Sequence, residues 1–365
     1  MMTKAVILAS EFPPQPGGIG NHAFHLAKGL QANGYQIQVV CDTRSASAGE
    51  ERDFDKGLPF EVIRIPRKKI IFLSYLNRIF VAFSLVRKCE VVISSGKFSI
   101  WLGAFLNVFY KRRFVAVIHG SEVKLPNAIL RKFTDWSLKS FDKVIAVSNY
   151  TKSLISHLNL NNVFVVPNGF EIKNPEVIVE KVKPAPVFIT IGNVTKRKGQ
   201  HNMIRALPTI LRKYPDAKYH IVGIPTEQAK LERLTLKLGV ESSVVFFGRV
   251  SEDLKIELLQ QADIFVMLSE STKKGDVEGF GIAILEANAL GIPAIGSKGC
   301  GIEDAISDGF SGKLVDNKAP EELLGILKEI LDNYEGYSKQ AKIWSENFSW
   351  DGIINRYLDI LEMKD

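Results

Sequence analysis

The sequence predicts an α/β protein with two doubly wound, mostly parallel sheets in tandem. Short apolar runs of strand length alternate with helical segments along most of the 365 residues. The alternation starts again after a charged, proline-containing segment near residue 171. The chain is also too long for one typical hydrophobic core. Together these three observations favour two domains, each built around its own sheet.

The first half opens with a βαβ pattern. We expect a strand from Lys4 to Ala9, a helix from Gly18 to Asn33 that Gly34 closes, and a strand from Gln36 to Cys41. Further strands are expected in the runs FEVIRI, EVVISS, FVAVIHG, KVIAVS and VFVVPNG, which begin at residues 60, 90, 114, 143 and 163. Helical segments separate several of these runs, so a parallel sheet with crossover helices is predicted.

The second half repeats this alternation after a segment, residues 171–186, that contains three prolines and is interpreted as a linker. Strands are expected in VFITIGN, AKYHIVG, VVFFGRV and ADIFVMLS, which begin at residues 187, 217, 244 and 262. Helices are expected between them, over residues 201–213, 226–238 and 251–261. The predicted domains are therefore residues 1–170 and 187–345. A last helix, about residues 346–365, is expected to pack back on the first domain.

Composition excludes several classes of protein. Hydrophobic residues make up 46% and charged residues 24%, which is ordinary for a globular chain. The three cysteines have no paired spacing, which argues for a reducing, cytoplasmic compartment and against a zinc site. No acidic pair has metal-binding spacing either, so no metal is expected. The longest apolar run, from Ile70 to Val86, is interrupted by Asn77 and Arg78 and is too short to span a membrane; the chain also begins without a signal-peptide pattern.

Positive charge is concentrated in one part of the chain. The net charge is +7, yet residues 61–143 hold sixteen lysines and arginines against five acids. Such asymmetry suggests an anionic partner, and aromatic residues interleave the cations. We expect the basic residues within 64–113 to contact an anionic membrane at its inner, cytoplasmic face. The alternative is a core helix whose lysines and arginines extend into solvent. The residues assigned to this surface are Arg64, Arg67, Lys68, Lys69, Lys111, Arg112 and Arg113, with Phe72, Tyr75, Phe80 and Phe83. No nucleic-acid-binding motif is present, so no nucleic acid partner is expected.

The segment PGGIGNHA, residues 16–23, matches a dinucleotide-binding fingerprint, with Asp42 nineteen residues after its last position. That fingerprint needs its first glycine in a tight turn directly after the strand, whereas here SEFPPQP intervenes. An NAD-dependent enzyme therefore stays only as an alternative. We prefer a loop in which the amides of Gly17 and Gly18 bind an anion; a turn without a ligand is the other interpretation.

Two further motifs follow predicted strand ends, where sites form in sheets of this kind. VIHGSE places His119 at a strand end, although a lone histidine is more often structural. In IGNVTKRKGQ, the cations Lys196, Arg197 and Lys198 lie in a glycine-containing turn before a helix. Three cations at a helix start could bind a diphosphate, and the alternative is a solvated basic turn.

The stretch EGFGIAILEANALG, residues 278–291, carries two acids in an apolar run. Glu278 is expected in a strand-to-helix loop, and Glu286 two turns into a helix that opens near Gly279 to Gly281 and stops at Gly291. Phosphate binds readily at a helix start, and a carboxylate on either side could accept hydrogen bonds from hydroxyl groups. The alternative is a helix-start acid followed by an exposed one.

Together, PGGIG, HGSE, VVPNGF, IGNVTKRKG and EGFGIAILEANALGIPAI resemble, in this order, the retaining nucleotide-sugar glycosyltransferases of family 4, which have the GT-B fold. The resemblance covers nearly the whole chain, and GDVEGFGIAILEA is most similar to the mannosyltransferase branch. It implies transfer of a hexose from a GDP- or UDP-sugar to a glycan or lipid-linked acceptor, in cell-surface polysaccharide or glycolipid synthesis. It also implies a front-face displacement that needs no metal or other cofactor.

The resemblance further implies roles for single residues. Glu278 would hold the hydroxyls of the donor sugar, and Glu286 those of the ribose. Lys198 would contact the diphosphate, and His119 would lie by the donor sugar. The remaining donor contacts are expected at Gly17, Gly18, Arg249, Val250, Gly279, Phe280, Gly281 and Ile282.

One position departs from the family pattern. Asn193 stands where members usually carry an arginine, and Arg197 and Arg249 are the candidates to replace it. A non-catalytic protein that binds nucleotide sugars therefore stays an alternative. A nucleotide-sugar epimerase has only the general architecture in its favour.

Overall fold

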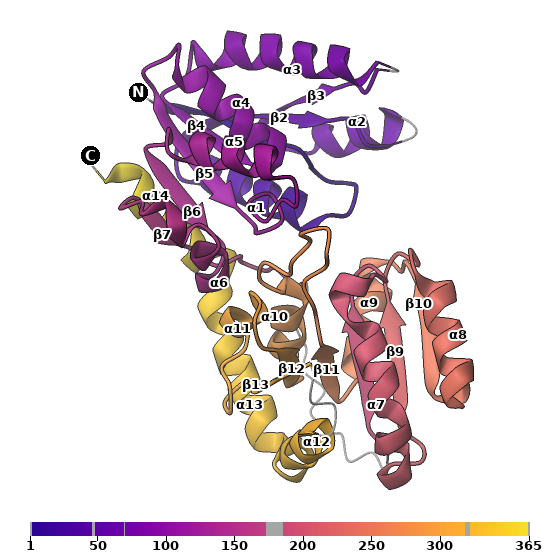
Figure 1. Ribbon diagram of the computed structural model, residues 1–365. Coiled ribbons are helices and arrows are strands. Elements are labelled where there is room, and N and C mark those ends of the chain that lie inside the picture. Colours follow the sequence, from indigo (N-terminus) through magenta and orange to yellow (C-terminus); the bar gives the residue numbers. More distant parts are fainter. Residues whose placement is uncertain (1, 46–47, 69, 173–184, 318–321, 364–365) are drawn as a thin grey trace. The chain divides into compact units, whose positions relative to one another are not determined.

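A computed structural model describes residues 2–45, 48–68, 70–172, 185–317 and 322–363. The chain forms two compact units, Met1–Gly169 together with Trp350–Asp365, and Phe170–Ser349 (Figure 1). Each unit contains one parallel sheet with crossover helices, so the predicted α/β class with two sheets is confirmed. The predicted linker falls mostly on residues 173–184, which lie outside the described residues.

The first unit is built on a parallel sheet with strand order β3-β2-β1-β4-β5-β6-β7. Its strands are β1 Thr3–Ala9, β2 Tyr35–Asp42, β3 Glu61–Ile65, β4 Val91–Ser95, β5 Arg113–Ile118, β6 Lys143–Ala146 and β7 Val163–Val165. Its helices are α1 Gly18–Ala32, α2 Ala48–Lys56, α3 Ile71–Val86, α4 Lys97–Asn107, α5 Ala128–Leu138, α6 Asn149–Ser153, the 3₁₀ helix η1 Ser156–Leu158, and α14 Trp350–Glu362.

Helices cover both faces of this sheet. α3, α4 and α5 pack side by side, while α14 packs against α1 (Figure 1). Right-handed crossovers place these two groups on opposite faces, because the strand order reverses between β3 and β4. The central strands are consequently buried on both sides and read as continuous apolar runs. Gly29 permits the close approach of α14, since a Cβ there would lie 2.8 Å from the side chain of Ile354.

The second unit has a parallel sheet with strand order β10-β9-β8-β11-β12-β13. Its strands are β8 Val187–Ile191, β9 Lys218–Val222, β10 Val244–Gly248, β11 Ile264–Met267, β12 Ala294–Ser297 and β13 Gly312–Val315. Its helices are α7 Gln200–Lys213, α8 Gln228–Leu238, α9 Glu252–Gln261, α10 Ile282–Ala289, α11 Ile302–Ala305, α12 Glu322–Asp332 and α13 Tyr334–Ser345, with the 3₁₀ helices η2 Lys196–Lys198, η3 Glu241–Ser243 and η4 Glu346–Phe348.

The longest apolar run of the sequence, residues 70–86, forms α3 from Ile71 to Val86. Within the described part of the chain, no helix combines the length and the apolar character needed to cross a membrane. One side of α3 is buried, as Arg78 and Ala82 show. On its outer side, large apolar side chains face solvent, and Phe72 and Phe80 are 65% and 71% exposed.

Candidate active site

In the second unit, the loops after β8 and β11 leave the same edge of the sheet. The two strands are parallel neighbours, although β9 and β10 separate them in sequence. In the sheet, β9 and β10 lie on one side of β8, and β11 to β13 lie on the other, so the strand order reverses between β8 and β11. Ligands of doubly wound sheets bind at such a switch point. The loop after β8 forms η2, and the loop after β11 runs from Leu268 to Gly281.

Glu278, in the loop after β11, pairs with two cations of η2. Its Oε2 lies 2.9 Å from Lys198 Nζ and accepts a hydrogen bond from Arg197 Nη1, and its side chain is only 9% exposed. Burial by itself would raise the pKa of Glu278, but Lys198 and Arg197 bring it below its ordinary value. The carboxylate is thus ionised at neutral pH. Two cations face one carboxylate, so this cluster retains affinity for a further anion.

Close backbone contacts fasten η2 to the loop after β11. Gly199 has a φ of 71°, and a Cβ there would lie 1.7 Å from the carbonyl oxygen of Leu268, so only glycine fits. The Glu270 amide donates to the carbonyl oxygen of Arg197 at 2.9 Å, and its carboxylate lies 3.3 Å from Lys196 Nζ. The position of the two cations is therefore set by the fold of the turn.

The start of α10 lies directly after Glu278 in the chain. Gly281 precedes the helix with a φ of 106°, and no side chain caps the first turn. The amide of Ile284 donates to the carbonyl oxygen of Gly281 at 2.9 Å, while the amides of Ile282 and Ala283 at the helix start can bind an anion. Phe280 is buried and packs on Phe348, with ring centroids 5.8 Å apart, so its expected donor contact can come only from its backbone.

Glu286, in α10, pairs with Lys255 of α9, with Oε1 and Nζ 3.2 Å apart. Lys255 also contacts Glu252 at 2.5 Å. Burial raises the pKa of Glu286, and Lys255 counteracts part of this effect. No sequence motif marks Lys255, because it lies in an ordinary helix and meets Glu286 only through the packing of the unit.

The position that departs from the family pattern lies beside η2. Asn193 is exposed, and its carbonyl oxygen accepts a hydrogen bond from Gln200 Nε2 at 3.2 Å. Arg249, also exposed, and Val250 follow β10, which is two strands away from β8. Of the two candidate replacements for an arginine at this position, Arg197 is the one that contacts Glu278.

In the first unit, His119 follows β5, and its Nε2 lies 2.9 Å from Oγ of Ser95 at the end of β4. Burial lowers the pKa of His119 to about 4, so the imidazole is neutral at pH 7. Glu122, from the same HGSE motif, accepts the backbone N–H of His119, and burial raises the pKa of Glu122 to about 7. Ser95 and Glu122 were not among the expected site residues, although both lie in or near predicted strand ends.

The loop between β1 and α1, residues 10–17, ends at Gly17 and leads into Gly18, the first residue of α1; it is called the glycine loop below. A Cβ on Gly17 would lie 2.2 Å from Oε2 of Glu11, whereas Gly18 has open space around it. No side chain caps the first turn of α1. Asp42, which a dinucleotide fingerprint would place on a ribose, instead forms an ion pair with Arg78 of α3.

The structure corrects the predicted basic surface at two positions. Arg64 is not part of that surface, because its side chain is only 9% exposed and binds Asp55. Arg113 is half-buried and donates a hydrogen bond to the carbonyl oxygen of Leu361. The exposed cations of the predicted set are Arg67, Lys68, Lys111 and Arg112, and Lys69 lies outside the described residues.

Comparison with known proteins gives two family matches that together span most of the chain. The model for Glycosyltransferase Family 4 matches residues 16–174, and the model for Glycosyl transferases group 1 matches residues 172–348. The GDP-mannose-dependent alpha-(1-6)-phosphatidylinositol monomannoside mannosyltransferase of Mycolicibacterium smegmatis is 32% identical over 339 residues, 85% of each chain.

Two other comparisons extend over nearly the full length. The GDP-mannose-dependent monoacylated alpha-(1-6)-phosphatidylinositol monomannoside mannosyltransferase of Corynebacterium glutamicum is 27% identical, over 98% of each chain. The crystal structure of Anabaena Alr3699/HepE in complex with UDP and glucose matches with a TM-score of 0.80 at 19% identity, covering 98% of this chain and 99% of that one. The chain thus has the GT-B fold and belongs to the family 4 (group 1) glycosyltransferases, so it is a glycosyltransferase.

Proposed function

We propose that this glycosyltransferase moves mannose from GDP-mannose to a lipid-linked acceptor with retention of the anomeric configuration. The observation that carries the proposal is the cluster of Glu278, Lys198 and Arg197 beside the uncapped start of α10. The relatives named as GDP-mannose-dependent mannosyltransferases with phosphatidylinositol mannoside acceptors support the choice of donor and acceptor class.

In the proposed complex, the diphosphate lies on the first-turn amides of α10 and takes Lys198 and Arg197 as counter-ions. The carboxylate of Glu278 then loses its contacts with these two cations and accepts hydrogen bonds from the hydroxyls of the mannose, which are good donors to a carboxylate. Glu286 accepts hydrogen bonds from the ribose in the same way. His119, Gly17 and Gly18 are further donor contacts expected from the family resemblance, and they stay predictions.

The proposed reaction breaks the bond between the anomeric carbon and the diphosphate oxygen. A bond from the same carbon to the acceptor oxygen forms on the same face of the sugar, and the acceptor proton passes to the leaving diphosphate. Negative charge grows on the diphosphate as its bond breaks, so fixed cations and helix amides stabilise the transition state more than the ground state. Lys198, Arg197 and the amides of α10 supply this stabilisation, and the proposal therefore needs no metal.

A donor panel tests this proposal directly. We expect GDP-mannose to raise the melting temperature more than UDP-glucose or ADP-glucose, because a ligand at 100 times its dissociation constant stabilises the folded state by about 2.7 kcal/mol. Transfer of radiolabelled mannose to phosphatidylinositol monomannoside is expected in the same preparation. A larger shift with a UDP- or ADP-sugar would make the donor assignment wrong. A shift with GDP-mannose but neither transfer nor hydrolysis would favour the non-catalytic alternative.

We also propose that the outer face of α3, α4 and α5 contacts an anionic membrane that holds the acceptor. Large apolar side chains are exposed along these three adjoining helices and directly after α4. They are Phe72, Leu73, Tyr75, Phe80, Phe105, Val108, Phe109, Ile129, Leu130, Phe133 and Trp136. Exposed cations border them, including Arg67 and Lys68 before α3, and Arg131 and Lys132 on α5. An apolar surface bordered by cations fits the interface of a membrane with anionic lipids.

Vesicle flotation tests the membrane contact. At low salt we expect the protein to float with phosphatidylglycerol vesicles and to be released at high salt, because salt screens the cations. The double variant Phe72→Ser, Phe80→Ser is expected to bind at least about tenfold more weakly, since it removes buried apolar area at the interface. Leu236→Ser is the matched control, because Leu236 on α8 is 65% exposed in the second unit. Wild-type protein that stays unbound at low salt would contradict the proposed contact.

A further inference from the structure

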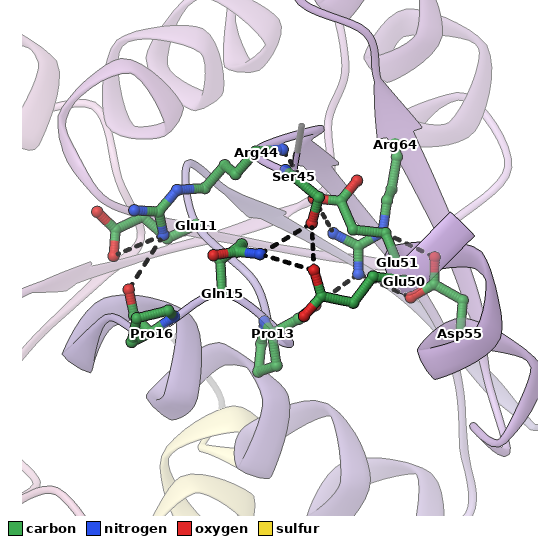
Figure 2. Close-up of polar contacts among 10 residues, drawn as sticks. All are labelled: Glu11, Pro13, Gln15, Pro16, Arg44, Ser45, Glu50, Glu51, Asp55 and Arg64. Carbon is green, nitrogen blue, oxygen red and sulfur yellow. Dashed lines mark hydrogen bonds and ion pairs between the residues drawn. The ribbon is translucent and has the colours of Figure 1, made fainter. Parts of the chain in front are cut away.

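The loop between β1 and α1 is fastened to β3 and α2 by an arginine, Arg64, whose side chain is 9% exposed (Figure 2). Arg64 of β3 donates from Nε and Nη2 to the two carboxylate oxygens of Asp55, at 2.7 and 2.8 Å. Its Nη2 also donates to the carbonyl oxygen of Pro13 at 2.5 Å. The guanidinium lies 5.9 Å from the ring centroid of the buried Phe12. One side chain thus joins the loop to a strand and a helix.

Glu51 of α2 extends this link to the segment after β2. Its side chain is 1% exposed, and its Oε1 lies 3.4 Å from Nη1 of Arg64. The same oxygen accepts the backbone N–H groups of Arg44 and Ser45, at 2.7 and 2.9 Å. The segment after β2 is therefore held by the helix that follows it.

That segment in turn contacts the loop near its start and at its end, as Figure 2 also shows. Nη1 of Arg44 lies 3.6 Å from the carboxylate of Glu11 and donates to the carbonyl oxygen of Pro16 at 3.5 Å. Nε2 of Gln15 donates to Oγ of Ser45 at 2.9 Å. The loop is consequently tied at Glu11, Gln15 and Pro16, the last of which directly precedes Gly17.

We infer that Arg64 is a positioning residue for the glycine loop. It holds this loop through its contacts with Asp55, Glu51 and Pro13. As a result, the amides of Gly17 and Gly18 are fixed before a ligand arrives. An apolar side chain of similar volume could fill the same space, but it could not link a loop carbonyl to two acids. A loop ordered in advance loses less conformational entropy on binding, so donor affinity depends on this link. This inference rests on the proposed contact of Gly17 and Gly18 with the donor.

Arg64→Lys keeps the charge but loses the paired hydrogen bonds to Asp55, and Arg78→Met is the matched control. Arg78 is also a buried arginine of the first unit, with a side chain 3% exposed, but its partners are Asp42 and the ring of Phe98. Asp55→Asn is a second variant that weakens the same link with a side chain of equal size, and it serves if Arg64→Lys does not fold.

Hydrogen exchange of the amides in residues 10–20, followed by mass spectrometry, reports on the loop without requiring activity. In Arg64→Lys or Asp55→Asn we expect exchange there to rise about tenfold, and KM for the donor to rise about tenfold with kcat within about twofold of wild type. Arg78→Met is expected to leave both quantities unchanged, even if its melting temperature falls.

Exchange in residues 10–20 that stays at the wild-type rate in both variants, or that rises equally in Arg78→Met, would overturn the inference. Faster exchange with an unchanged KM would leave the positioning role of Arg64 intact. That outcome would instead contradict the contact of Gly17 and Gly18 with the donor, so the two proposals fail separately.

Discussion

Replacing Glu278 by glutamine is expected to lower kcat/KM for sugar transfer by about a thousandfold or more. An amide accepts hydrogen bonds from sugar hydroxyls less strongly than a carboxylate does, and one of its two oxygens is replaced by a donor. The substitution also leaves Lys198 and Arg197 next to each other without their shared counter-ion. Removing one partner of a buried ion pair typically costs about 3–5 kcal/mol, so some loss of folding stability is expected as well.

The loss of transfer must therefore be separated from the loss of stability. Asp263→Asn is the matched control, because Asp263 is a buried acid of the same unit that accepts the backbone N–H of Val187 at 2.7 Å, where β8 begins. We expect this control to lower the melting temperature while transfer in the folded protein stays near the wild-type rate. Glu278→Gln with wild-type transfer would show that the carboxylate does not hold the donor.

Replacing Lys198 by alanine is expected to lower kcat by about a hundredfold to a thousandfold, with a smaller effect on KM. The ammonium group is already placed 2.9 Å from Glu278, beside the start of α10, so little reorganisation is needed when charge develops on the diphosphate. Its effect should therefore be greatest in the transition state. Steady-state kinetics with a saturating acceptor would measure the change in kcat.

Lys196→Ala is the control for this variant, since Lys196 lies in the same turn but its side chain is 63% exposed and pairs with Glu270. We expect its kcat to stay within about threefold of wild type, because exposed ion pairs contribute little. Equal losses in the two variants would mean that the basic turn acts only through its general charge. An unchanged kcat in Lys198→Ala would remove this lysine from the proposed mechanism.

Features with a local cause could be predicted from the sequence. The apolar run ADIFVMLS, which begins at residue 262, contains β11, as its hydrophobicity indicates. Gly279 and Gly281 after Glu278 lead into α10, as the glycine pattern indicates. α10 ends at Ala289 with Leu290 as its C-cap, and Gly291 follows in the left-handed region with a φ of 73°, so this glycine stops the helix as expected. Parallel strands bring their carboxyl ends to one edge, so Lys198 and Glu278 could be expected on the same side of a sheet.

Pairings between distant side chains could not be predicted in this way. The cations that surround Arg64 in the sequence suggest a basic surface, whereas its side chain is 9% exposed and pairs with Asp55. Lys255 lies in a helix of ordinary composition, and only the packing of α9 and α10 brings it to Glu286. Hydrophobic periodicity reports which face of an element is buried, but it does not report which charged residue of another element meets that face.

The proposed binding of a diphosphate at the start of α10 is tested most directly by a crystal structure of the protein with bound GDP. We expect diphosphate oxygens within about 3 Å of the first-turn amides of α10 and of Lys198 Nζ. We expect the ribose hydroxyls to donate to Glu286. A diphosphate bound elsewhere, with Glu278 still paired with Lys198 and Glu286 still paired with Lys255, would contradict the proposed site.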